Sequence, residues 1–214
     1  DWSSDVCSSD LCLTQDAIMS LTKVTYSMID GATANVKDFG ASSSGDATSA
    51  IQATIDSLPD GGTVICVPNV TYTISQVTLS SNVTLNLNGA TFKQLAGTDN
   101  KTMVQAINEN NVSVINGSFD GNKTNVTGNL AGGVLFSGCN NITLSDLSFV
   151  DIRRICINAA SCSRINVTNV SATTVGIATT TTGCLLQFAG NSSRINVQNA
   201  EITSSYGVGT LIQQ

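Results

Sequence analysis

Histidine is absent from this chain, and charged residues make up only 11% of it. There is also no C-x-x-C pair, so a zinc site has no credible ligand set. The nine basic residues are scattered except for Arg153-Arg154, which argues against a nucleic-acid partner. No apolar run reaches the roughly 18 residues that a membrane-spanning helix needs. These absences argue against a zinc site, a nucleic-acid partner and a membrane-spanning helix.

Proline-rich stretches and charge runs are missing as well, and the chain has only two prolines. Nothing in the sequence therefore divides it into separate domains. Many Asn, Thr, Ser and Gly residues give a polar but weakly charged exterior. A single elongated domain is expected.

One amphipathic helix is expected early in the chain, over residues 47–58. Its apolar residues recur at i, i+4 and i+7 and share one face, at Ile51, Ile55 and Leu58. Asp46 is suited to the N-cap, and Pro59 ends the helix. The β-branched run at residues 63–67 then predicts a strand.

From there the chain repeats a strand pattern at intervals of 23 to 30 residues. Each repeat has an inward apolar anchor, followed by a polar and another apolar residue; the anchors are Val83, Val112, Ile142, Ile165 and Ile195. A second apolar position lies seven residues further on, at Phe119, Phe149, Ala172 and Ile202. Each repeat should therefore carry at least two period-2 strands. Such repeats without a second helix predict an all-β solenoid whose first coil is covered by the helix.

The cysteines fit the same register. Cys139 and Cys162 each lie three residues before an anchor, so they should stack at one corner of adjacent coils. That placement permits a disulfide. We expect reduced thiols instead, because free cysteine packs as a small hydrophobe and the coils need no staple. Cys66, Cys156 and Cys184 fall in strand-like runs and are expected in the core.

The opening segment carries a family resemblance. Its parts are D-F-G-A at residues 38–41, A-I-Q at 50–52, the glycine-led strand at 61–68, Tyr72-Thr-Ile-Ser75 and Phe119-Asp-Gly-Asn122. Together they resemble the pectate-lyase-like superfamily, in its branch of rhamnogalacturonases, polygalacturonases and epimerase-like pectate lyase domains. The resemblance implies a single-stranded, right-handed parallel β-helix with an N-terminal capping α-helix. It also implies action on polysaccharide, as a glycoside hydrolase or a polysaccharide lyase.

A second resemblance lies just upstream, in residues 23–32. This stretch is similar to the junction in phage tail-spike proteins, where a head-binding part is joined to the β-helix. It implies a homotrimer on the virion surface or outside the cell that binds, and often cuts, a bacterial surface polysaccharide. The alternative is a non-catalytic β-helix that binds glycans or projects a surface protein.

The ends of the chain differ from its middle. Residues 1–11 resemble the in-frame translation of a sequencing-library adaptor and are left out of fold reasoning. Residues 12–34 are then an upstream junction, and residues 35–214 the parallel β-helix domain. Residues 209–213 match residues 183–187, which open the previous coil, so we expect the domain to be truncated at its C-terminus.

Four residues are candidates for catalysis: Asp120, Asp146, Asp151 and Arg154. Paired carboxylates serve as general acid and base in glycoside hydrolysis. A carboxylate with an arginine suits the calcium binding and proton abstraction of a lyase, and no other cofactor or metal is expected. The structural alternatives are a tight turn at Asp120, and a solvated corner where Asp146 and Asp151 form a polar cluster with Arg153 and Arg154.

The polygalacturonase motifs N-T-D, D-D, G-H-G and R-I-K are absent. Either the catalytic coils follow Gln214, or other residues act, or the protein has no activity; we favour the first. Eleven N-x-S/T sequons occur, with examples at Asn82, Asn111, Asn141 and Asn166. Because asparagine tolerates the left-handed conformation at coil corners, we expect these asparagines to be structural.

Overall fold

Two parallel sheets form the protein in this computed structural model, which describes residue 25 and residues 28–29, 31–128, 132–177, 183–206 and 210–212. Sheet A contains β1 (Thr33–Asn35), β2 (Gly62–Ile65), β3 (Thr71–Ile74), β5 (Val83–Asn86), β6 (Thr91–Gln94), β8 (Asn110–Asp120), β10 (Asn140–Val150), β12 (Ser163–Thr173) and β14 (Ser193–Ile202). Sheet B contains β4 (Val77–Thr78), β7 (Thr102–Ile107), β9 (Gly132–Ser137), β11 (Ile155–Ala160), β13 (Cys184–Ala189) and β15 (Thr210–Ile212).

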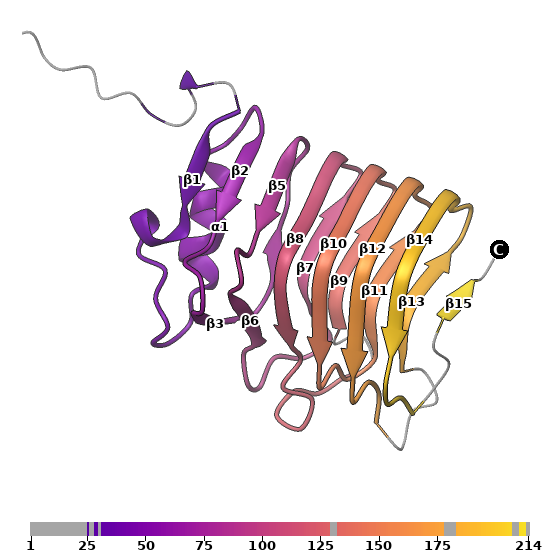
Figure 1. Cartoon of the computed structure of the whole chain (residues 1–214). Helices are drawn as coiled ribbons and strands as arrows, with labels where there is room; N and C mark the ends of the chain where they lie inside the picture. Colours follow the sequence, from indigo (N-terminus) through magenta and orange to yellow (C-terminus); the bar gives the residue numbers. More distant parts are fainter. Residues whose placement is uncertain are drawn as a thin grey trace, which may run out of the picture.

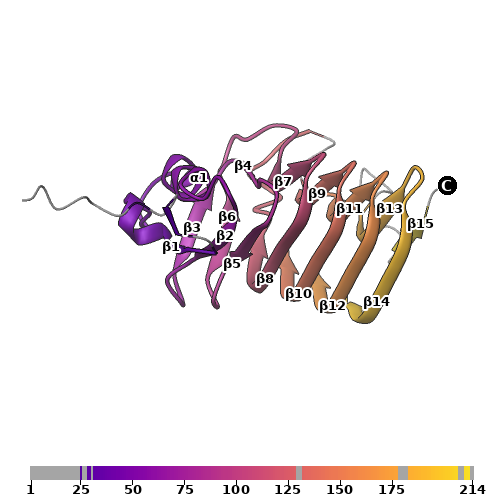
Figure 2. The same cartoon turned by 90° about the horizontal axis from the view of Figure 1, so that it is seen from above.

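The chain alternates between the two sheets and advances by one coil per turn (Figure 1). In the later coils, strands of sheet A run downward in front, strands of sheet B run upward behind, and the coils advance from left to right. This winding is right-handed. Viewed from above, the strands stack as layers along a single axis (Figure 2). The fold is the predicted right-handed parallel β-helix.

The register confirms the predicted anchors. Ile142 of β10 pairs with Val112 of β8 on one side and with Ile165 of β12 on the other. The second apolar position is also in register, because Phe149 pairs with Phe119 and with Ala172. The inner faces of the coils therefore stack like with like, and a ladder of buried rings runs through Tyr72, Phe92, Phe119 and Phe149.

The two predicted segments of each repeat belong to one bent strand of sheet A. Strand β8 has 11 residues, and so does β10. Each bends at a residue with positive φ, at Asn116, Asp146, Asn169 and Asn199 in successive strands. Asparagine and aspartate tolerate this left-handed conformation better than other side chains. The sequons Asn82, Asn111 and Asn141 also have positive φ, as expected of structural corner residues. Asn166 does not have positive φ; it pairs within strand β12, and its Oδ1 accepts a hydrogen bond from Asn196.

Helix α1 (Thr48–Asp56), preceded by the 3₁₀ helix η4 (Val36–Phe39), covers the first coil at the N-terminal end (Figure 1). The helix is shorter than predicted, and its N-cap is Ala47 rather than Asp46. The carboxylate of Asp46 still accepts a hydrogen bond from the Thr48 backbone N–H at 2.9 Å. It therefore satisfies a free N–H at the helix N-terminus from the residue before the N-cap. No helix among the described residues is long and apolar enough to cross a membrane.

Two strand predictions need correction. Strand β2 ends at Ile65, earlier than the predicted residue 67, because the chain turns toward Pro68, which cannot donate to a sheet. Strand β15 pairs with β13 so that Thr210 lies opposite Leu186, two residues away from the alignment of residues 209–213 with residues 183–187.

The cysteines lie where the register placed them. All five described cysteines, Cys66, Cys139, Cys156, Cys162 and Cys184, are buried free thiols. The backbone N–H of Cys139 donates to Cys162 Sγ at 3.3 Å, which shows that these two stack in adjacent coils. Because the stacked thiols and neighbouring carbonyls satisfy one another, the corner packs without a covalent link.

Candidate functional site

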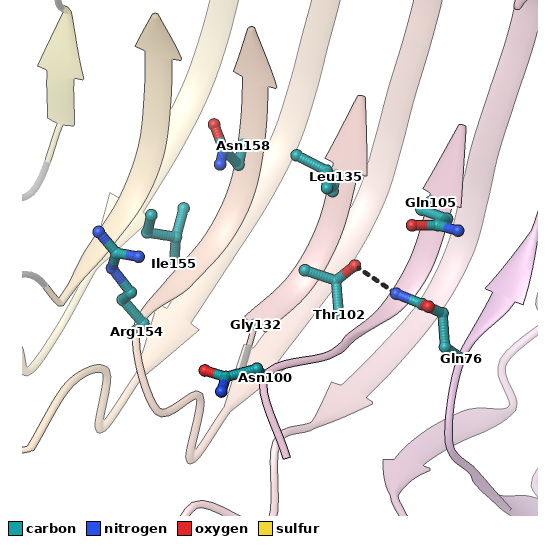
Figure 3. A pocket seen from close by; sticks show the side chains of 9 residues that line it. All are labelled: Gln76, Asn100, Thr102, Gln105, Gly132, Leu135, Arg154, Ile155 and Asn158. Carbon is teal, nitrogen blue, oxygen red and sulfur yellow. Dashed lines mark hydrogen bonds between the residues drawn. The ribbon is translucent and has the colours of Figure 1, made fainter. Parts of the chain in front are cut away.

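A concavity with a volume of about 270 Å³ lies on the outer face of sheet B, and we call it the sheet B groove (Figure 3). In the middle of β7, β9 and β11 the side chains of Gln105, Leu135 and Asn158 point outward between buried neighbours, whereas Thr102 and Ile155 border the groove from the first positions of β7 and β11. Strands β7, β9 and β11 contribute Thr102, Gln105, Leu135, Ile155 and Asn158. The adjoining connections contribute Gln76, Asn100 and Arg154.

The middle of the groove is a row of side chains in register. Leu135 pairs with Gln105 on one side and with Asn158 on the other. The row continues to Thr78 of β4 and Gln187 of β13. Adjacent strands lie about 4.8 Å apart, so the row offers one outward side chain per coil at that spacing. The groove thus runs along the axis of the β-helix.

Hydrogen bonds hold part of this lining in place. Gln76 Nε2 donates to Thr102 Oγ1 at 3.3 Å, as Figure 3 shows. Gln105 Nε2 donates to Thr78 Oγ1 at 3.0 Å. The amide oxygen of Asn158 differs, because it is buried and accepts no hydrogen bond from the described residues.

Charge in the groove comes from one residue. Arg154 is the sole charged residue of the lining, and no Asp or Glu contributes to it within the described parts of the chain. Burial raises the pKa of the Cys184 thiol to about 11, and the nearby Arg154 charge partly opposes that shift. The groove therefore combines amides, a hydroxyl, two aliphatic side chains and one cation.

Asp120 is held in a turn and in an ion pair. Its Oδ1 accepts the backbone N–H of Asn122 at 2.8 Å, and its Oδ2 lies 2.8 Å from Lys93 Nζ. These contacts match the tight-turn alternative for Asp120. The carboxylate lies at the end of β8, in sheet A, and does not line the sheet B groove.

Asp151 and the arginines do not form the cluster that the sequence suggested. Asp151 Oδ1 lies 3.6 Å from Lys123 Nζ and accepts from Thr174 Oγ1 at 2.7 Å. Arg153 donates to the backbone carbonyls of Gly128 and Lys123, at 3.0 and 3.2 Å. Arg154 belongs to the groove instead. Consecutive residues on a connection between two sheets can point to different faces, so adjacency in sequence did not bring them together.

Asp146 lies at the bend of β10, where its Oδ1 accepts from Asn169 Nδ2 at 2.9 Å. It lines a second, more open concavity of about 460 Å³ on sheet A, with Asn116, Ser118 and Ser148. No group of three or more His, Cys, Asp or Glu side chains that could hold a metal ion occurs in the described part of the chain. Of the four candidates, only Arg154 lies in the sheet B groove.

The groove residues Gln105 and Asn158 did not emerge from the sequence. Their positions follow the anchors of sheet A by a variable number of residues, because the connections differ in length. The available signal was the outward polar position between two buried apolar residues, as in Val104-Gln105-Ala106 and Ile157-Asn158-Ala159. Aligning the second strand of each repeat would have found the row.

Solved structures share this architecture. The A-module of a mannuronan C-5 epimerase from Azotobacter vinelandii matches with a TM-score of 0.73 and 21% identity, over 85% of this chain and 53% of the module. An exopolygalacturonase from Thermotoga maritima matches with a TM-score of 0.70 and 14% identity, over 85% of this chain and 54% of the enzyme. This chain shares the parallel β-helix fold of these two proteins.

A viral protein, ORF18 of Geobacillus virus E2, also matches this β-helix, with a TM-score of 0.53 and 15% identity over 85% of this chain and 47% of the viral protein. The β-helix thus spans about half the length of each of these structures. No protein-family model and no curated protein sequence matches the chain. At these identities the likeness establishes the fold alone.

Proposed function

We propose that this β-helix is part of a carbohydrate-active protein and binds a polysaccharide along the sheet B groove. The observation that carries the proposal is the row of outward side chains in register, with Gln105 and Asn158 one coil to either side of Leu135. A linear polymer laid across the strands meets an equivalent position in every coil. The names of the epimerase and the exopolygalacturonase, both polysaccharide-acting enzymes, support this choice of ligand.

The lining favours an anionic sugar. Arg154 supplies a guanidinium, which suits a carboxylate or sulfate group, and no lining carboxylate among the described residues opposes it. The amides of Gln76 and Gln105 and the hydroxyl of Thr102 suit sugar hydroxyl groups. Leu135 and Ile155 supply apolar contact for the C–H face of a ring.

Catalysis needs groups beyond those in the groove. Hydrolysis of a glycosidic bond uses a pair of carboxylates, and a lyase uses a base, with calcium to neutralise the uronate. The groove has no Asp or Glu within the described residues. We therefore assign these coils to polysaccharide binding, and we propose that hydrolase or lyase chemistry belongs to other parts of the protein. The same observation favours a non-catalytic glycan-binding β-helix as the second candidate.

The biological setting we propose is a phage tail spike, on the virion surface or outside the cell, assembled as a homotrimer. The fold shared with a protein of Geobacillus virus E2 and the junction-like stretch at residues 23–32 support it. Half of that stretch lies outside the described residues. Light scattering on the full-length protein tests the assembly, and a monodisperse monomer would count against a trimer.

Binding is tested with the purified chain by affinity electrophoresis in gels containing polygalacturonate, alginate or dextran. We expect retardation by at least one acidic polymer, and little or none by neutral dextran. Arg154→Gln should weaken that retardation about tenfold, as expected for the loss of a charge-assisted contact. Arg164→Gln is the matched control, because Arg164 lies exposed on sheet A, outside the groove. A folded protein that none of the three polymers retards would overturn the proposal.

A further inference from the structure

Asn158 brings a buried hydrogen-bond acceptor into the sheet B groove. The residue is half-buried on β11, but its Oδ1 atom is buried and has no hydrogen-bond partner among the described residues. Figure 3 shows Asn158 and Leu135 on neighbouring strands that line the groove. An acceptor taken out of water without a partner destabilises the folded state.

Outward asparagines elsewhere in this protein avoid that cost. On sheet A, Asn141 Nδ2 donates to Asn111 Oδ1 and Asn196 Nδ2 donates to Asn166 Oδ1, each at 2.8 Å. In each pair the amide oxygen of the earlier coil receives its donor from the asparagine of the next coil. Asn158 breaks this pattern, because its register partner in the preceding coil is Leu135 and its register partner in the following coil, Gln187, donates no hydrogen bond to Asn158 Oδ1.

The same row shows that an apolar side chain fits this position. Leu135 occupies the equivalent place one coil earlier, where it is half-buried and needs no hydrogen bond. Folding alone would therefore be served at least as well by leucine at position 158. The asparagine leaves an acceptor desolvated and unpaired before any ligand arrives, and a turn of its side chain toward the groove would let that acceptor recognise a hydroxyl group selectively.

We propose that Asn158 Oδ1 determines the specificity of the groove by accepting a hydrogen bond from a hydroxyl group of the bound sugar. This inference rests on the proposed polysaccharide binding. The bound hydroxyl supplies the missing donor, so binding satisfies a group that folding leaves unsatisfied. A sugar that presents no hydroxyl at this point leaves the acceptor unpaired and binds less tightly.

The test compares Asn158→Leu with Asn166→Leu, in which the same substitution is made at an exposed asparagine whose Oδ1 is already satisfied. We expect Asn158→Leu to raise the midpoint of thermal unfolding by about 2–4 °C, because it removes the unpaired acceptor. It should also weaken retardation by polygalacturonate or alginate about tenfold. Asn166→Leu should lower the midpoint slightly and leave retardation unchanged.

The outcomes separate the two proposals. A lower midpoint for Asn158→Leu would overturn the inference, because it would mean that the acceptor is satisfied in the folded protein. If the wild type is retarded and Asn158→Leu is retarded equally, the inference is overturned but polysaccharide binding stands. If polygalacturonate, alginate and dextran all fail to retard the wild-type protein, both proposals fall together.

Discussion

The side chain of Gln52 on α1 pairs with the backbone of Thr78 on β4 as a neighbouring strand would. The Thr78 N–H donates to Gln52 Oε1 at 2.8 Å, and Gln52 Nε2 donates to the Thr78 carbonyl at 3.1 Å. Strand β4 is the first strand of sheet B, so its outer edge has no strand partner among the described residues. One carboxamide thus closes an edge that would otherwise be open to pairing with another chain.

Replacing Gln52 by alanine should lower the free energy of unfolding by about 1–3 kcal/mol, because both Thr78 groups lose their partner. It should also increase self-association, since the exposed edge of β4 becomes available. Urea unfolding and light scattering measure the two effects. Gln198→Ala on β14 is the control, because that amide makes only a 3.4 Å contact to Asn196. Equal effects of the two substitutions would contradict the edge-capping role.

Asp146→Asn should stabilise the protein by about 0.5–1.5 kcal/mol. In the row of bends, Asn199 donates to Asn169 and Asn169 donates to Asp146, both at 2.9 Å. Asp146 has no side-chain N–H, so it cannot donate to Asn116 in the preceding coil. Asn116 itself donates to Asn86. An asparagine at position 146 would complete the row.

Thermal unfolding measures the effect of Asp146→Asn. Asn169→Asp is the opposite change, since it places a second carboxylate beside Asp146 and removes the donor between them. We expect that variant to unfold at a lower temperature than the wild type. If Asp146→Asn is less stable than the wild type, the carboxylate of Asp146 itself stabilises the folded protein.

The β-helix could be predicted because its coils repeat in sequence. Anchors such as Ile142 and Ile165 recur with the same local pattern, and apolar residues at those positions have no other way to be buried. Helix α1 could be predicted for a similar reason, since its apolar face and end signals are local. Its N-cap was misplaced by one residue, where Asp46 and Ala47 compete for the same role.

The groove could not be predicted in the same way. Its residues meet only through pairing between coils, as Asn158 meets Leu135, and outward positions carry no hydrophobic signal. Ion pairs between coils were hidden for the same reason. Lys123 lies 28 residues before Asp151 in sequence, yet it forms the ion pair that we expected Asp151 to form with the arginines.

Asp120→Ala should lower stability by about 1 kcal/mol and leave polysaccharide binding unchanged. The substitution removes the turn hydrogen bond to Asn122, while the ion pair with Lys93 is partly exposed and adds little. Urea unfolding and affinity electrophoresis measure the two quantities. Lys93→Met removes the ion pair alone and should have the smaller effect on stability. Lost binding with unchanged stability would instead place Asp120 in the ligand site.

Alkaline pH should destabilise the protein through its buried thiols. Burial raises the pKa of Cys66 to about 12, whereas the same thiol in the unfolded chain titrates near about 8.5. Between these values the unfolded chain has lost the proton that the folded protein keeps. The free energy of unfolding is therefore unaffected by this thiol below about pH 8.5. It falls as the pH rises toward 12, by up to about 1.4 kcal/mol per pH unit for one thiol.

Urea unfolding of the wild type and of Cys66→Ala, at several values between about pH 8 and 11, measures this slope. The variant should be less stable at neutral pH, because it leaves a small cavity in the core, yet it should lose stability less steeply as pH rises. Cys184, whose pKa burial raises to about 11, contributes to the slope that remains in the variant. Parallel curves for the two proteins would mean that the Cys66 thiol ionises as readily in the folded state as in the unfolded chain.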